Sequence, residues 1–430
     1  MIRNRSPRPC YFTDRVAPSR IFEGRIMRCP TIPGSGSPAA ATLFGIRLPK
    51  SSIYLHGGHG FDVGPVVQGH KVIVMEVNRR QFLAATSAGL LSCACTRSLD
   101  AGTSGRLDLL LSAHAGRWPE REGAGANHYP MAAEVLEAFG YEEEIDDAWI
   151  EGASLYGSLS PESSVMDSGD ARLGDYGGFN LWLERFRREL AERPWQKVIK
   201  TWAPTLAPGI SAATFHGVIR TGHAVRALAL QRTPARLEEL AAGLAFWAAR
   251  YVELPSGGGI ADFSELEHPW LNQAEDVPFH DVMARMTERP LVSVIPIEGD
   301  PRIALDAVVR EGAIAFLEML VAERHRIWNL HTVTGPAAVE WLFPHVDRRS
   351  AERLVSFARQ ATLATLASFG EPYQSRAHER KDLEDWPTYI ERAVASRSVH
   401  GIKLIDALVR FDRDDDPIWR SVAAQWFEWV

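Results

Sequence analysis

The sequence predicts an all-α fold, with a single large multi-helix domain in residues 98–430 around a buried, histidine-lined site. Apolar residues recur at intervals of three and four from about Leu107 onward, which is the spacing of an amphipathic helix. The alternation of apolar and polar residues that marks a half-buried strand is nearly absent. Because no repeat, low-complexity tract or long linker interrupts this region, we expect one domain.

The segment at the N-terminus lacks this periodicity. Residues 1–74 hold seventeen Gly or Pro, none of the thirteen Trp, and ten Lys or Arg against three Asp or Glu. Such a composition predicts a disordered leader, or an over-extended reading frame upstream of a true start at Met75.

Residues 75–97 resemble an export signal. The run Arg-Arg-Gln-Phe-Leu at 79–83 is similar to the twin-arginine motif. The apolar stretch at 82–94 is too short to span a bilayer but suits the central region of a signal. Leu-Leu-Ser-Cys at 90–93 resembles a lipobox, in which Cys93 carries a lipid anchor. We therefore expect export by the twin-arginine machinery, giving a periplasmic protein or a membrane-anchored lipoprotein.

Helical spacing defines the elements of the domain. The segments expected to be helices are, in order, Met131–Phe139, Asp147–Ser158, Leu181–Arg193, Gln196–Leu206, Ala212–Ala229, Pro234–Val252, Ala304–Glu323, Ala337–Phe343, Ser350–Ala367, His378–Ala393, Val399–Arg410 and Asp416–Trp429. Prolines stand before the first of these and at the start of the sixth, where a helix tolerates them. Residues 255–259 and 288–301 are expected to be loops, with a candidate short strand at 291–296.

Charge and cysteine content narrow the function. Residues 75–430 carry 47 − 10 = 37 Lys or Arg against 54 − 3 = 51 Asp or Glu, so the basic surface that nucleic acid requires is not expected. All four cysteines precede residue 96. The domain therefore has no disulfide framework, thiolate metal site or cysteine nucleophile. Any metal must be held by nitrogen and oxygen.

Four histidines stand in motif-like contexts between residues 128 and 331 of the domain. His128 precedes Tyr-Pro just before an expected helix, and His331 precedes Thr-Val-Thr-Gly at an expected helix start. His216 and His223 are seven residues apart, about 20° short of two full helical turns, so both face the same way. Between and after them, Arg220 and Arg226 either form salt bridges or bind phenolate oxygens.

Near the C-terminus, His400 and Lys403 share one helix face with Asp406. A lone histidine on an apolar helix face is more often a hydrogen-bonded core residue than a ligand, and Asp406 is equally well explained as a solvated carboxylate or as an acceptor for a ligand imidazole. Recurrence of histidines on four separate segments favours a site. The chain has no Gly-x-Ser-x-Gly, His-Glu-x-x-His or phosphate-loop motif that would point to another chemistry.

At these residues the domain resembles the questin oxidase-like family, whose members oxidise or cleave aromatic polyketides such as anthraquinones. The matching segments span the whole domain and are residues 127–131, 195–204, 215–226, 331–334 and 399–403. The resemblance implies a largely helical protein. It also implies a mononuclear non-haem Fe(II) oxygenase in which four histidines and a carboxylated lysine hold the metal.

On this resemblance the expected metal ligands are His128, His223, His331 and His400 with Lys403. His216 is then the alternate ligand, or a group that orients the substrate beside Arg220 and Asp406. Neutral imidazoles suit Fe(II), and a buried Lys403 tends to lose its proton and can add carbon dioxide.

The expected partners are dioxygen and a small aromatic substrate, in a pocket lined by some of Trp149, Trp195, Trp202, Phe215 and Trp328, although core packing explains most of these. Some family members require NADPH, yet no dinucleotide fingerprint is present. Tyr129, where a smaller residue is expected, and the export signal both depart from the family pattern and leave the substrate open.

Two other functions fit the same residues. The histidine cluster could bind Zn(II) and activate water in a hydrolase. Alternatively, the protein could be a non-catalytic lipoprotein that sequesters apolar ligands. In that case the histidines should be dispersed in space.

Overall fold

The computed structural model describes residues 105–429 apart from 122–124, 160–170, 261–264, 266–286, 288–291, 319–325 and 370–381. All of them belong to one compact unit, Met75–Val430. They are mostly helical, with a single two-stranded sheet, so the predicted all-α class is confirmed. The leader, the export signal and Cys93 lie outside the described residues. In the part of the chain that is described, no helix has the length and apolar character needed to cross a bilayer.

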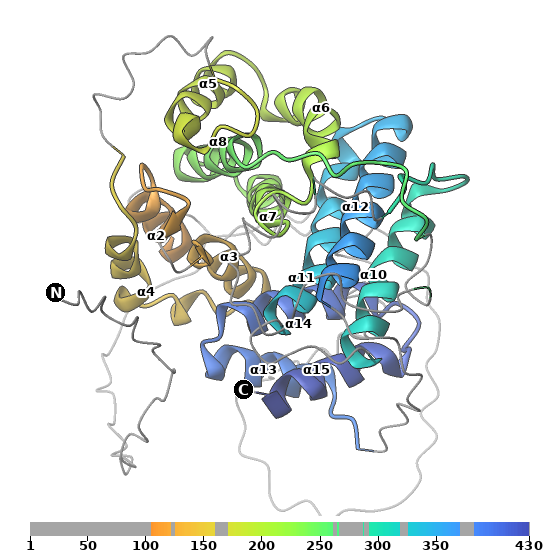
Figure 1. Cartoon of the computed structure of the whole chain (residues 1–430). Helices are drawn as coiled ribbons and strands as arrows, with labels where there is room; N and C mark the ends of the chain where they lie inside the picture. Colours follow the sequence, from red (N-terminus) through yellow and green to blue (C-terminus); the bar gives the residue numbers. More distant parts are fainter. Residues whose placement is uncertain are drawn as a thin grey trace, which may run out of the picture. The chain divides into compact units, whose positions relative to one another are not determined.

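The elements form three groups along the chain (Figure 1). The first group contains α2 (Arg106–His114), the antiparallel pair β1 (Glu120–Arg121) and β2 (Gly125–Ala126), α3 (Tyr129–Phe139), the 3-10 turn η1 (Glu142–Glu144), α4 (Asp147–Glu151) and η2 (Gly152–Leu155). The second contains η5 (Tyr176–Gly178), α5 (Phe179–Glu192), α6 (Trp195–Leu206), η6 (Ala207–Gly209), α7 (His216–Leu230) and α8 (Pro234–Ala249). The third contains α10 (Pro301–Glu318), α11 (Arg326–Val339), η9 (Glu340–His345), α12 (Arg348–Phe369), α13 (Trp386–Ser396), α14 (Val399–Phe411) and α15 (Pro417–Trp429).

Local sequence fixes several helix ends. Thr233, Asp385 and Ser398 each accept a hydrogen bond from a backbone N–H in the first turn of α8, α13 and α14. At the end of α3, Gly140 takes a left-handed conformation with φ of 83°, which glycine adopts without steric cost. These caps define where α8, α13 and α14 begin and where α3 ends.

Helix α7 is the central element, and every residue from His216 to Leu228 is buried. It packs against α8, α3 and α11, and α14 in turn packs against α3 and α11. Gly217 and Gly222 allow close approach, because a Cβ atom at these positions would come within 2.7 Å of Trp247 and Ala338. Helices α3, α7, α11 and α14 therefore surround a common interior region, which holds the site described below (Figure 1).

Two expected helix boundaries are wrong. The helix expected from Ala212 begins at His216, because residues 213–215 have positive φ angles of 48°, 57° and 63°. The helix expected at 337–343 is the end of a longer one, α11, followed by η9. His331 therefore lies in the second turn of α11 rather than before a helix.

The remaining differences are smaller. The helix expected at 147–158 is split between α4 and η2. The candidate strand at 291–296 is reduced, within the described residues, to a single bridge between Ile260 and Val292. The helix expected from His378 begins at Trp386 in the described part, and residues 370–381 lie outside it.

Candidate metal centre

Four imidazole rings from four helices lie together in the interior. The ring centroids are separated by 4.7 Å for His128 and His216, 4.5 Å for His216 and His331, 5.6 Å for His331 and His400, and 4.2 Å for His400 and His128. The rings come from the N-cap of α3, the first residue of α7, the second turn of α11 and the first turn of α14. We call these four side chains the imidazole cluster.

Lys403 joins the cluster from the next turn of α14. Its Nζ atom lies 2.6 Å from Nδ1 of His128, and the residue is only 1% exposed. Burial lowers the pKa of Lys403 from 10.5 to about 7, because an ammonium loses its hydration there. A large fraction of this amine is thus uncharged near neutral pH.

Backbone carbonyls set the tautomers of two cluster rings. Nδ1 of His216 donates to the Ala213 carbonyl, and Nδ1 of His331 donates to the Ile327 carbonyl at 2.6 Å. A neutral imidazole carries one ring proton, so in both rings the Nε2 atom is a bare acceptor. Metal-bound histidines typically use their other nitrogen in this way.

The two bare Nε2 atoms face each other across 3.1 Å. Burial lowers the pKa of His216 to about 3, and lowers the pKa of His331 well below 6.5, so no proton bridges them at neutral pH. Two lone pairs at this distance repel unless a cation lies between them or beside them. Metal–nitrogen bonds of about 2.0–2.1 Å put neighbouring ligands about 3.0–3.4 Å apart, and the spacing of this pair fits that range.

His400 carries another ring nitrogen that is not hydrogen-bonded. Its Nε2 atom is buried and has no hydrogen-bond partner, a state that is rare and costly for a buried polar atom. Burial also lowers the pKa of His400 and of His128 well below 6.5. His128 and His400 are half-buried, whereas Lys403 is enclosed.

The cluster is not a closed coordination sphere as it stands. Among the described residues, no three His, Cys, Asp or Glu side chains converge closely enough to hold a metal ion. One pair, His216 and His331, already has ligand spacing, while Lys403 occupies Nδ1 of His128. A cation bound to the pair would need His128 and His400 to turn toward it.

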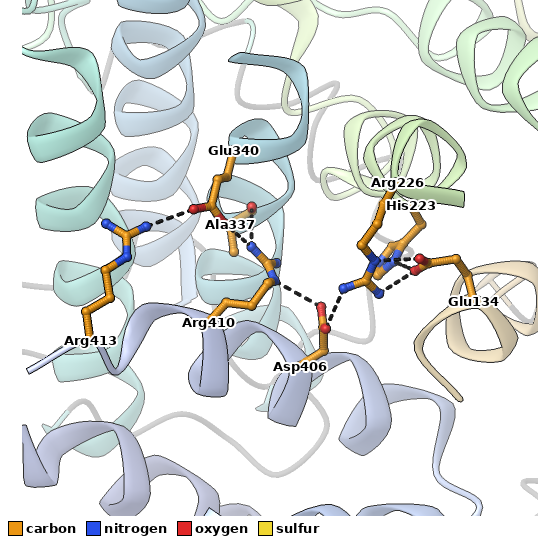
Figure 2. A network of polar contacts seen from close by, with 8 residues as sticks. All are labelled: Glu134, His223, Arg226, Ala337, Glu340, Asp406, Arg410 and Arg413. Carbon is orange, nitrogen blue, oxygen red and sulfur yellow. Dashed lines mark hydrogen bonds and ion pairs between the residues drawn. The ribbon is translucent and has the colours of Figure 1, made fainter. Parts of the chain in front are cut away.

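His223, which the resemblance selects as a ligand, lies in a different polar group. Its Nδ1 atom is 2.7 Å from a Glu134 carboxylate oxygen, and Arg226 binds the same carboxylate through Nε at 2.5 Å (Figure 2). Seven residues along α7 amount to about 10.5 Å, so His223 stands two turns below His216. In the structure His216, and not His223, is the α7 histidine of the cluster.

The group around His223 extends into an ion network that ties the same four helices together. Asp406 accepts from Arg226 at 2.6 Å and from Arg410 at 3.2 Å. Arg410 also binds Glu340, next to the end of α11, and Glu340 accepts from Arg413, whose side chain is 40% exposed. The network therefore runs from the buried Glu134 to the partly exposed Arg413 (Figure 2).

The buried carboxylates of this network are ionised. Burial would raise the pKa of Asp406, but Arg226 and Arg410 outweigh it and lower the pKa to about 2. Burial opposes ionisation of Glu134 too, and Arg226 and His223 together lower its pKa below 4.5. Asp406 was expected to accept a hydrogen bond from a ligand imidazole, but in the structure it accepts from the two arginines. Asp406 instead anchors α14 one turn after Lys403.

Arg220 forms a salt bridge rather than facing the cluster. Its Nε and Nη2 atoms bind the Glu239 carboxylate of α8 at 2.6 and 2.7 Å, with both side chains almost fully buried. This pair fixes α7 against α8. The guanidinium is already committed, so the expected substrate role of Arg220 has no support in the geometry.

Most of the aromatic residues expected to line a pocket have packing roles. Trp149 contacts Tyr129, Trp195 contacts His345, and Trp202 contacts Trp182. The Tyr129 ring also closes over Gly152, where a Cβ atom would lie 2.9 Å from it. It is therefore held against α4 and η2.

The sequence interpretation missed Glu134. The residue lies in an apolar run, Met-Ala-Ala-Glu-Val at 131–135, and is 2% exposed. A carboxylate on the apolar face of an expected helix needs a buried cationic partner. The signal available in the sequence was a carboxylate on one apolar helix together with Arg226 and His223 on another.

Comparisons of the chain with protein-family models and with curated proteins find no match. The fold and the site therefore define the class of protein by themselves. It is a helical protein in which four imidazoles with lowered pKa values lie beside a buried lysine. The likeness to the questin oxidase-like family remains a resemblance of motifs.

Proposed function

We propose that this protein is a non-haem Fe(II) oxygenase that acts on an aromatic, polyketide-like substrate at the imidazole cluster. The observation that carries the proposal is the pair of bare Nε2 atoms of His216 and His331, 3.1 Å apart. The partnerless Nε2 atom of His400 supports it. Nitrogen donors of this kind suit Fe(II), and the motif resemblance favours iron as the metal.

The metal would be held by His128, His216, His331 and His400, with Lys403 as a fifth ligand. Four imidazoles bring no negative charge to a divalent ion. The uncharged amine of Lys403 can supply it: Nζ attacks the carbon of carbon dioxide, a nitrogen–carbon bond forms, one N–H proton leaves to solvent, and an anionic carbamate results. This reaction would also release Nδ1 of His128 from its present contact with Nζ.

Iron bound here would supply the one-electron chemistry that dioxygen needs to react with an aromatic ring. The protein supplies the rest. The Ala213 and Ile327 carbonyls hold two rings with Nε2 inward, and burial keeps the imidazoles uncharged. A dioxygenase reaction needs no external reductant, whereas a monooxygenase reaction would need two electrons from NADPH.

Zinc is the second candidate, because a spacing of 3.1 Å also suits neighbouring ligands of a Zn(II) ion. In that case the bound ion would activate water, and the protein would be a hydrolase.

Metal analysis of the full chain, purified without chelator, tests the proposal. We expect about one iron per chain, together with oxygen uptake when phenolic polyketides are added. His216→Ala should lose both, whereas His345→Ala, which removes a histidine packed on Trp195 outside the cluster, should keep both. Zinc with ester or amide cleavage would favour the hydrolase. Absence of any bound metal in the reconstituted wild type would contradict both functions.

A further inference from the structure

The segment just before His216 has an unusual backbone. Ala213, Thr214 and Phe215 follow one another with positive φ angles, although none of them is glycine. Thr214 is β-branched, and such residues are genuine outliers in the left-handed region. Local preference does not select this conformation, so tertiary packing must impose it. Residues held in this way concentrate at ligand clamps and active sites.

The left-handed turn acts directly on His216. Its reversal of the chain brings the Ala213 carbonyl back to Nδ1 of His216. The same carbonyl accepts the backbone N–H of His216 at 3.2 Å. The turn therefore fixes the position of the residue and also directs the bare Nε2 atom toward His331.

Packing against α11 holds the turn in place. Phe215 is fully buried, and its ring lies directly on Gly335, where a Cβ atom would come within 2.4 Å of Cγ. Gly335 is four residues after His331, so it lies on the same face of α11, one turn away. Contact between Phe215 and Gly335 thus determines where along the axis of α11 the start of α7 packs. It thereby also determines the distance between His216 and His331.

We propose that Phe215 and Gly335 are positioning residues that hold the Nε2 atoms of His216 and His331 at ligand spacing before metal binds. The inference rests on the proposed function and concerns the affinity of that site. Neither residue touches the metal or the substrate. Their effect on metal affinity would pass through His216, which follows Phe215, and His331, which lies one turn before Gly335.

The experiment compares variants of Phe215 and Gly335, which we call the clamp residues, with matched control variants. Gly335→Ala is paired with Gly222→Ala. Gly222 also lies where α7 contacts α11, and a Cβ atom there would come within 2.7 Å of the Ala338 carbonyl oxygen. It is two turns farther along α7 than Phe215 and so lies away from the cluster. Phe215→Leu is paired with Phe186→Leu, a phenylalanine of α5 that is equally buried. The leucine variants keep an apolar side chain of intermediate size, so we expect them to fold even if an alanine variant does not.

Each full-length protein is stripped of metal and titrated with Co(II), whose visible absorption reports coordination, and then anaerobically with Fe(II). Thermal melting of the metal-free form measures structural damage separately. We expect the clamp variants to bind metal ten- to hundredfold more weakly than wild type, as is typical when groups that orient a ligand are lost. The controls should melt as early as the clamp variants but bind metal within about threefold of wild type.

Three outcomes are distinct. Weaker binding in the clamp variants alone supports the inference. Equal affinity in clamp and control variants, with a wild type that binds metal, overturns the inference and leaves the proposed function intact. A wild type that binds neither Co(II) nor Fe(II) contradicts the proposed function itself, and the inference with it.

Discussion

Replacing Lys403 by methionine should remove a large pH dependence from the stability of the metal-free protein. In the unfolded chain the lysine has its usual pKa of 10.5, while burial lowers it to about 7 in the fold. Between these values the unfolded chain holds a proton that the folded chain lacks, so the free energy of unfolding rises with pH. Each pH unit contributes about 1.4 kcal/mol, and the whole interval about 5 kcal/mol.

Urea unfolding at pH 7.5, 8.5 and 9.5, in chelated and carbon-dioxide-free buffer, measures this contribution. The stability of wild type relative to Lys403→Met should rise by about 2.5 kcal/mol from pH 7.5 to pH 9.5. Lys200→Met is the control, because Lys200 is exposed on α6, and its difference from wild type should stay flat. A flat difference for Lys403→Met as well would show that the amine is hydrated in the fold. The argument for an uncharged lysine would then fail.

Three further outcomes are expected. His216→Ala should lose bound metal, whereas His223→Ala should keep it and melt earlier; the opposite result in metal analysis would return His223 to the ligand set. Arg226→Met leaves Glu134 with only His223 and Asp406 with only Arg410, so urea unfolding should show a loss of about 3–5 kcal/mol. A loss below about 1 kcal/mol would mean that water reaches the network. Changing Arg79 and Arg80 together to lysine should keep the protein inside the cell in a fractionation assay, and unchanged export would refute a twin-arginine signal.

Periodicity was sufficient to predict the helical class and most helices, because burial of one face dictates where apolar residues recur. It failed where local signals disagree with tertiary packing. Gly335 and Pro336 indicate a helix end, yet α11 continues through both. A proline here leaves the Thr332 carbonyl without its usual partner. Gly312 of α10 lies so close to that carbonyl that a Cβ atom would be 2.3 Å away, so the irregular turn is covered by a neighbouring helix.

Which α7 histidine joins the imidazole cluster illustrates a different limit. Helical spacing correctly places His216 and His223 on one face of α7. The position of a residue on a helix also depends on its distance along the helix axis. Seven residues also separate them by about 10.5 Å along the axis, and ligands of one ion lie within about 4 Å of each other. At most one of the pair can belong to a mononuclear site. Deciding which one requires the neighbouring helices, because Glu134 of α3 pairs with His223 and leaves His216 level with His331.

The four helices thus carry two polar layers with opposite requirements. The upper layer, the imidazole cluster, is neutral and contains nitrogen atoms without partners. The lower layer pairs its buried carboxylates with arginines. An ion network is a weak source of stability but a specific one, because each charge is costly unless its partner is in place. The ion network lies one to two helical turns away from the imidazole cluster. It holds the backbones of α3, α7 and α14 in place independently of the cluster. Under the proposed function, such a division would keep the fold in place before a cation binds to the imidazole cluster.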